Sequence, residues 1–255
     1  MKVIILAGGM GTRLKNVVNN VPKPMAPVQG KPFLAYVILA LAAQGLREII
    51  LSVGYRKDTI QSHFGNGSKW GVSIVYSEED TPLGTGGSVR EALKMADESH
   101  SLVLNGDTFN QVDFREMEEH HLSGKRLATI GLIDSDDTDR YGFVKMDEAS
   151  DILEFCEKSD RHSGYINRGI YIMDRTVLDH MPASGSFSLE NDLFPELIPH
   201  GMRGFISRGF FVDIGIPSTY HFINDHNYLL ETGNADNHDR CHEHEHDNTR
   251  QKWTK

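Results

Sequence analysis

A glycine-rich turn directly follows the first apolar run of the chain, residues 3–6, and it suits chemistry with phosphate. Without a Cβ, the glycine backbone can approach an anion closely, so that N–H groups face phosphate oxygens. Thr12 adds a hydroxyl and Arg13 adds a forked cation that matches phosphate geometry. The spacing fits neither the G-x-G-x-x-G dinucleotide pattern nor the Walker pattern. We interpret the turn as a phosphate-binding loop, with a purely structural turn as the alternative. Its glycines are Gly8, Gly9 and Gly11.

One lysine and two aspartates could act on a bound phosphate, the lysine directly and the aspartates through a metal ion. Pro22 and Pro24 restrict the backbone around Lys23 and so present its ammonium, although a solvated loop lysine is the alternative. Asp107 and Asp213 each follow an apolar run, and the end of a buried strand opens into a cleft. For Asp107 the alternative is a cap of the next turn. Together the two carboxylates could hold a hard divalent cation, and Mg²⁺ is the expected ion.

The elements that must position these residues alternate between strand and helix patterns. The expected strands cover 3–6, 48–53, 72–76, 101–109, 127–132 and 165–174. The expected helices cover 32–45, 57–64 and 114–122, and three more begin after the glycine turn at 84–87, after a cap at Ser186 or Ser188, and at Pro217. This alternation favours an open parallel sheet with helices on both faces, which binds ligands at the carboxyl ends of its strands.

Composition limits the class of protein. The chain has 255 residues, 39% of them hydrophobic and 24% charged, as expected for one globular enzyme domain. A formal net charge of −10 argues against nucleic acid as the main partner, because a reader of the phosphate backbone needs a basic face. Cys156 and Cys241 imply no disulfide framework. No apolar segment is long enough to span a bilayer, so we expect no membrane partner and a cytoplasmic location. The oligomeric state stays open, with a homo-oligomer as one alternative.

The last part of the sequence differs from the rest. We expect a single domain over residues 1–231 and a disordered, His-rich tail over residues 232–255, which lacks apolar periodicity. The tail could bind zinc or nickel opportunistically, but its spacing matches no structural zinc finger. The side chains concerned are His238, Cys241, His242, His244 and His246.

Seven short motifs, taken in order, resemble the signature of the sugar-1-phosphate nucleotidyltransferases. They are LAGGMGTRL, PKPM, PLGTGG, NGD, EK, NRGIY and FVDIG, and they extend over nearly the whole chain before the tail. The resemblance implies a doubly wound, Rossmann-like mixed α/β sheet of the nucleotide-diphospho-sugar transferase type. It also implies a reaction in which a sugar 1-phosphate attacks the α-phosphorus of a nucleoside triphosphate and releases pyrophosphate, with Mg²⁺ held by Asp107 and Asp213.

The resemblance also implies a role for individual residues. Glu79 stands where some relatives have a base-reading glutamine, and its carboxylate would accept from the N1–H and exocyclic amine of guanine. Glu157 and Lys158 would contact the sugar and its phosphate, with a surface ion pair as the alternative. Asn167 would bind sugar hydroxyls, with a satisfied core amide as the alternative. The implied catalytic residues are Arg13, Lys23 and Asp107; the nucleotide-binding residues are Leu6, Ala7, Gly8, Gly9, Gly11, Thr12, Arg13, Glu79, Gly84 and Thr85; the sugar-phosphate-binding residues are Lys23, Gly142, Glu157, Lys158 and Asn167.

Longer stretches narrow the resemblance to the D-glycero-D-manno-heptose 1-phosphate guanylyltransferases, which use GTP to make GDP-heptose for surface polysaccharides. These stretches are KPMAPV, KPFL, PLGTGG, LNGDTF, DRYGFV, INRGIY and FFVDIGIP. Transferases that act on mannose, glucose or N-acetylmuramate 1-phosphate with GTP, dTTP or UTP are alternatives. A non-catalytic regulator that binds nucleotide sugars is a further alternative, although all four charged residues of the implied site are present. One departure is Ser159, which replaces the proline that follows Glu157 and Lys158 in most relatives.

Overall fold

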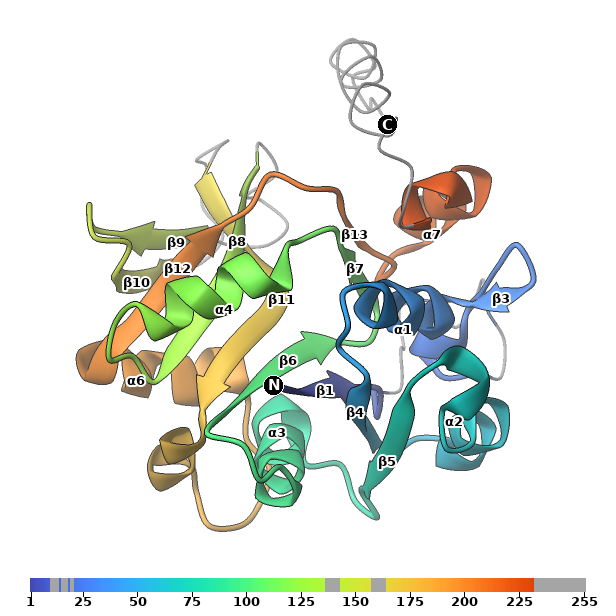
Figure 1. Cartoon of the computed structure of the whole chain (residues 1–255), viewed down its shortest axis with the longest axis horizontal. Helices are drawn as coiled ribbons and strands as arrows, with labels where there is room; N and C mark the ends of the chain where they lie inside the picture. Colours follow the sequence, from blue (N-terminus) through green and yellow to red (C-terminus); the bar gives the residue numbers. More distant parts are fainter. Residues whose placement is uncertain (10–13, 15–17, 19–20, 136–142, 157–163, 232–255) are drawn as a thin grey trace, which may run out of the picture.

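A nine-stranded sheet forms the centre of the computed structural model, which describes residues 1–9, 14, 18, 21–135, 143–156 and 164–231 (Figure 1). Seven strands follow the order β10–β9–β11–β6–β1–β4–β5, and β8 and β12 continue the sheet beside β11. The pairs β1–β4, β1–β6, β4–β5 and β8–β12 are parallel, whereas β11 runs antiparallel to β6, β8 and β9. The strands are β1 (Lys2–Leu6), β4 (Glu48–Val53), β5 (Ser73–Glu78), β6 (His100–Asn105), β8 (Ala128–Ser135), β9 (Phe143–Met146), β10 (Ile152–Cys156), β11 (Gly164–Asp174) and β12 (Met202–Ile206).

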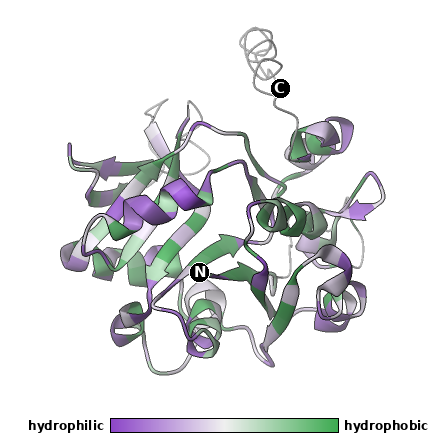
Figure 2. Ribbon diagram, viewed as in Figure 1, coloured by the Kyte–Doolittle hydropathy of each residue, from purple (hydrophilic) through white to green (hydrophobic). Residues whose placement is uncertain are grey.

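Helices cover both faces of this sheet, which confirms the predicted doubly wound α/β fold. Successive side chains of β1 point to opposite faces. Val3 and Ile5 therefore pack in the core that contains the apolar residues of α1, whereas Ile4 packs with those of α3. Figure 2 shows the central strands β1 and β6 as mainly hydrophobic, whereas α4 carries a hydrophilic face. The helices are α1 (Phe33–Ala43), α2 (Lys57–Phe64), α3 (Gly84–Met95), α4 (Phe114–Leu122), α6 (Phe194–Gly201) and α7 (Pro217–Asp225).

Proline and glycine set the limits of α1 as the sequence predicts. Pro32 is the residue before the first turn, and the helix begins at Phe33. It ends before Gly45, whose φ of +81° is one that glycine adopts without a steric penalty. The apolar residues between them are almost all buried. The helix therefore fixes one wall of the core beneath the parallel strands.

The chain differs from the expected single strand over 101–109. Strand β6 ends at Asn105, and a turn at Gly106 and Asp107 leads into a separate short strand, β7 (Thr108–Asn110). The Gly106 N–H donates to the Leu6 carbonyl, and a Cβ on Gly106 would lie 2.8 Å from that oxygen, so only glycine fits. Strand β7 pairs with β13 (Phe211–Asp213) in a two-stranded sheet of its own. The turn thus directs Asp107 away from the large sheet.

The remaining described elements are a late helix, several short 3-10 helices and a hairpin. Ser188 caps the expected late helix, which begins as a π-helical turn, Leu189–Leu193, before continuing as α6. Short 3-10 helices precede or follow the regular elements: η2 (Lys23–Met25), η3 (Ser68–Trp70), η4 (Arg175–His180) and η6 (Asn227–Leu230). A hairpin of β2 (Pro27–Val28) and β3 (Lys31–Pro32) leads into α1. Among the described residues, no helix has the length and apolar character needed to cross a membrane.

Candidate active site

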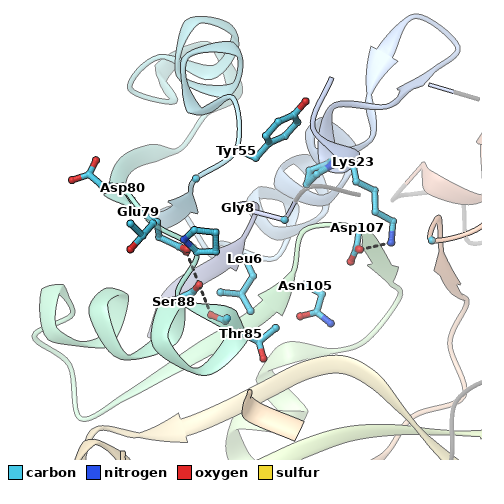
Figure 3. A pocket seen from close by; sticks show the side chains of 17 residues that line it. Leu6, Gly8, Lys23, Tyr55, Glu79, Asp80, Thr85, Ser88, Asn105 and Asp107 are labelled. Carbon is cyan, nitrogen blue, oxygen red and sulfur yellow. Dashed lines mark hydrogen bonds and ion pairs between the residues drawn. The ribbon is translucent and has the colours of Figure 1, made fainter. Parts of the chain in front are cut away.

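A cavity of about 610 Å³ opens at the carboxyl ends of the parallel strands (Figure 3). Strands β1, β4, β5 and β6 run in the same direction, so the loops that follow them meet at one edge of the sheet. The first turn of α3 closes the cavity on one side, and η2 with Lys23 closes it on another. Segments from the whole length of the described chain thus contribute to a single site.

Lys23, Asp107 and Asp213 meet at one end of this cavity. The Lys23 ammonium contacts Asp107 Oδ2 and lies 3.2 Å from Asp213 Oδ1. Pro24 and Met25, which follow Lys23 in η2, are buried and fix the lysine backbone. Asp213 Oδ1 also accepts from the Gly215 N–H at 2.6 Å. Because one ammonium contacts both carboxylates, the two aspartates are close enough to share a cation, and their oxygen donors suit Mg²⁺.

A buried arginine fixes the two short strands next to these acids, β7 directly after Asp107 and β13, which ends at Asp213. Arg168 is fully buried, and its Nε donates to Asn110 Oδ1 on β7 at 3.0 Å. Its other nitrogens donate, each at 2.9 Å, to the carbonyls of the segment before β13, namely those of Ser207, Gly209 and Phe210. Burial lowers the pKa of Arg168 to about 10. The guanidinium therefore holds β7 and the approach to β13 in one arrangement.

Glu79 lies under the glycine turn and takes part in an internal network. Its Oε1 accepts from the Ser52 hydroxyl at 2.9 Å and from the Ser88 hydroxyl at 2.5 Å. Its Oε2 accepts from the Leu83 N–H at 3.2 Å, and a Cβ on Gly8 would lie 3.3 Å from Oε1. A carboxylate has about four acceptor positions, so about one on Oε2 stays available to a ligand. Glu79 thus shapes the first turn of α3 in addition to facing the cavity.

Asn167 belongs to a hydrogen-bonded chain that reaches α3. Its Nδ2 donates to the Tyr171 hydroxyl at 3.0 Å, and its Oδ1 accepts from the Gly169 N–H at 2.8 Å. Tyr171 is 3.5 Å from Glu190 Oε1, and the Thr85 hydroxyl donates to Glu190 Oε2 at 3.0 Å. Burial first, and then the charge of Glu190, raises the pKa of Tyr171 well above its ordinary value. The amide of Asn167 is thus half-buried and engaged within the protein.

Most of the predicted nucleotide-side residues in the described ranges lie at the cavity. Those lining it are Leu6, Gly8, Gly9, Lys23, Glu79, Gly84, Thr85 and Asp107. Ala7 is fully buried and donates its N–H to the Ser52 carbonyl, so it supports the turn from below. Asp213 is not among the described residues that line the cavity, but it forms an ion pair with Lys23, which does line it. Asn167 is not among the described lining residues either. Six predicted residues lie outside the described ranges: Gly11, Thr12, Arg13, Gly142, Glu157 and Lys158.

Several cavity residues were not predicted from the sequence. Tyr55 follows the end of β4, and Asn105 is the last residue of β6. Their place after parallel strands is a signal that could have identified both. Ser88 carried no such signal, because its role depends on the fold that brings it to Glu79. The other additions are Pro24, Gly54, Asp80, Thr81, Pro82 and Gly215.

The chain resembles known proteins over most of its length. The family described as "Nucleotidyl transferase" matches residues 2–228. The D-glycero-alpha-D-manno-heptose 1-phosphate guanylyltransferase of Aneurinibacillus thermoaerophilus is 42% identical over 221 residues, which are 86% of this chain and 95% of that protein. The enzyme of the same name from Campylobacter jejuni subsp. jejuni serotype O:2 is 38% identical and matches 88% of this chain and 99% of its own.

A solved structure supports the same relationship. The crystal structure of HddC from Yersinia pseudotuberculosis complexed with GMP-PN has a TM-score of 0.78 and 35% sequence identity, and the match covers 88% of this chain and 98% of that one. Its fold therefore agrees with the sheet and helices described above. With a family match from residue 2 to residue 228 and relatives aligned over almost their full length, this chain belongs to the nucleotidyl transferase family.

Proposed function

We propose that the protein condenses D-glycero-D-manno-heptose 1-phosphate with GTP to give GDP-heptose and pyrophosphate. The observation that carries this proposal is the convergence of Lys23, Asp107 and Asp213 at one end of the cavity that also contains the glycine turn and Glu79. With a divalent cation on the two carboxylates, such a constellation would neutralise the charge of a triphosphate and a sugar phosphate at the point where they meet. The guanylyltransferase relatives support heptose phosphate and GTP as the substrate pair.

In the proposed site, the nucleotide lies along the carboxyl edge of the sheet. Backbone N–H groups of the glycine turn, with Thr12 and Arg13, would bind the triphosphate, and Arg13 would neutralise the departing pyrophosphate. Gly84 and Thr85 would lie against the base. The remaining acceptor position of Glu79 would take one hydrogen bond from guanine, so the carboxylate reads the base and holds its loop in place.

The sugar phosphate would attack from the side where Lys23 lies. A phosphate monoester is already a nucleophile, so the reaction needs positioning and neutralised charge more than a general base. Asp107 and Asp213 would hold Mg²⁺, which supplies positive charge opposite the reacting phosphate oxygens. Lys23, which contacts both acids, would then direct its ammonium to the phosphates. Gly142, Glu157, Lys158 and Asn167 would bind the sugar.

Two wider statements belong to the same proposal. We assign the catalytic domain to residues 1–231 and treat residues 232–255 as a tail outside it. We also place the reaction in the cytoplasm, because both substrates are highly charged phosphates that do not cross a bilayer unaided, and we assign its product to the synthesis of surface polysaccharide.

A pyrophosphate-release assay tests the reaction and its substrates together. The purified chain is incubated with Mg²⁺ and each pair drawn from GTP, ATP, UTP and dTTP with heptose, mannose, glucose or N-acetylmuramate 1-phosphate. We expect the highest kcat/KM with GTP and heptose 1-phosphate, and turnover at least about a hundredfold lower with the Asp107→Asn variant. Preference for another pair would overturn the specificity but keep the reaction class. Absence of turnover with every pair, together with calorimetric binding of a nucleotide sugar, would favour a regulator.

A further inference from the structure

A second cluster of metal-binding side chains lies away from the cavity. The cluster consists of His180, Glu196 and His200, each of which offers one ligand atom, and these atoms lie within 4.8 Å of one another. The two imidazole rings have centroids 4.5 Å apart. His180 ends η4, which follows β11 at Asp174, the residue that pairs with the start of β6. Because the cavity lies at the other end of β6, the cluster is at the opposite edge of the sheet.

The packed core holds the backbone of both elements that carry this cluster. Glu196 and His200 are four residues apart on α6 and therefore project from the same face of the helix. Their helix is held by Phe194 and Leu197, which are both fully buried. On the other element, Val177 is fully buried and Met181, next to His180, is 8% exposed. The Asp174 side chain also caps η4 by accepting from the Thr176 N–H at 2.8 Å.

Hydrogen bonds and ion pairs within the described structure do not account for these three side chains. Within the described part of the chain, none of them makes a hydrogen bond or ion pair with another residue. His180 is half-buried, whereas Glu196 and His200 are exposed, so an ion can reach them from solvent. Two imidazole rings tilted against each other at 4.5 Å beside a carboxylate, without hydrogen bonds that would explain their approach, form a donor set that suits a transition-metal ion.

We propose that His180, Glu196 and His200 bind one transition-metal ion of the Zn²⁺ class, which ties η4 to α6. Imidazole nitrogen favours Zn²⁺, Ni²⁺ or Cu²⁺ over Mg²⁺, which prefers oxygen ligands throughout. Three protein ligands leave a fourth tetrahedral position for water. The site therefore differs in ligand type, position and consequence from the pair Asp107 and Asp213, because it would stabilise a junction between elements and touch no substrate.

The test must separate this site from the histidines and cysteine of the tail, which can bind the same metals. A background variant of the full chain therefore replaces the four tail histidines with alanine and Cys241 with serine. In this background, we compare the unchanged cluster with His180→Ala/His200→Ala and with the matched control His221→Ala, which removes an exposed histidine of α7. Zn²⁺ binding is counted by isothermal titration calorimetry, with Mg²⁺ as the comparison ion, and thermal unfolding is recorded with and without ZnCl₂.

We expect the background chain and the His221→Ala control to bind one Zn²⁺ and to unfold at higher temperature when ZnCl₂ is added. The double variant should lose that ion and the temperature shift, and Mg²⁺ should produce neither effect at this site. If the background chain binds no Zn²⁺, or if the double variant binds as much as the control, the proposal is wrong. Circular dichroism of the zinc-free variants shows whether each is folded, and Glu196→Gln offers a milder variant that should weaken binding if the alanine pair unfolds.

Discussion

Replacing Lys23 with methionine removes the ammonium that two acids share while keeping the length of the side chain. The side chains of Lys23, Asp107 and Asp213 are 11%, 29% and 16% exposed, so the ion pairs are neither fully buried nor at the surface. Exposed pairs contribute about 0.2–1 kcal/mol, and breaking a buried pair costs about 3–5 kcal/mol. We therefore expect Lys23→Met to lower the free energy of unfolding by about 1–3 kcal/mol in the presence of a chelator.

That loss corresponds to a decrease in Tm of about 3–9 °C, at about 3 °C per kcal/mol for a domain of this size. Mg²⁺ should restore part of it, because the ion binds the two unopposed carboxylates of the variant without displacing an ammonium. The rise in Tm on addition of Mg²⁺ should thus be larger in Lys23→Met than in the unchanged protein. Turnover should fall about 10²–10³-fold, the range typical of losing one group that stabilises charge in the transition state.

Differential scanning calorimetry with EDTA or MgCl₂, followed by the pyrophosphate-release assay, measures these effects. Lys69→Met is the matched control, because Lys69 is exposed and distant from both acids in the chain. If Lys23→Met unfolds at the same temperature as the control in EDTA, and if Mg²⁺ shifts both equally, the ammonium does not neutralise the acids. Near-normal turnover would refute its part in the reaction.

Four other substitutions probe different features. Asp107→Asn should reduce turnover at least about a hundredfold and weaken its dependence on Mg²⁺, with an unchanged circular dichroism spectrum. Arg168→Met should lower the free energy of unfolding by about 3–5 kcal/mol, measured by urea denaturation, because the buried Asn110 Oδ1 and three half-buried carbonyls lose their donor. Burial lowers the pKa of His121 to about 4, so below about pH 6.5 the unfolded chain takes up a proton that the folded chain does not, and stability is lost as pH falls towards that folded value. His121→Gln should therefore lose less stability than the unchanged protein between about pH 7.5 and pH 5, a difference of about 2 kcal/mol measured from urea denaturation. Gly86→Ala should destabilise by about 1–3 kcal/mol in thermal melts, because its Cβ would lie 2.2 Å from the buried Phe187 ring.

The local sequence pattern was sufficient to predict several of the strands and helices that define the fold. The strand over Glu48–Val53 and the helices over Lys57–Phe64 and Phe114–Leu122 were predicted with the bounds that the structure has. Their apolar periodicity is strong, and Gly54, Gly65 and the Asp113 cap mark their ends. The glycine turn and Lys23 were equally visible, because their local composition limits what the backbone can do.

The remaining features depend on contacts between distant segments. The end of β6 at Asn105 follows from the close approach of Gly106 to Leu6, and β7 exists only because β13 pairs with it. The hydroxyls that engage Glu79 come from β4 and α3, so the number of acceptor positions that its carboxylate keeps free could not be predicted from its own neighbours in the sequence. Sequence patterns located the two aspartates and the edge of the cavity. The fold, in contrast, determines which hydrogen-bonding positions of each polar side chain are already occupied.

The pairing of β7 with β13 also determines when the acid pair can form. The bond from Lys23 to Asp107 joins residues 84 positions apart, and that from Lys23 to Asp213 joins residues 190 positions apart. Contacts at such separation form late, because the intervening chain must be ordered first. During synthesis, a ribosome-bound chain that already contains the glycine turn, Lys23 and Asp107 still lacks the second carboxylate until β13 has emerged and docked. Lys23, Asp107 and Asp213 therefore come together only after β13 has docked, and a shorter chain lacks one of the two carboxylates.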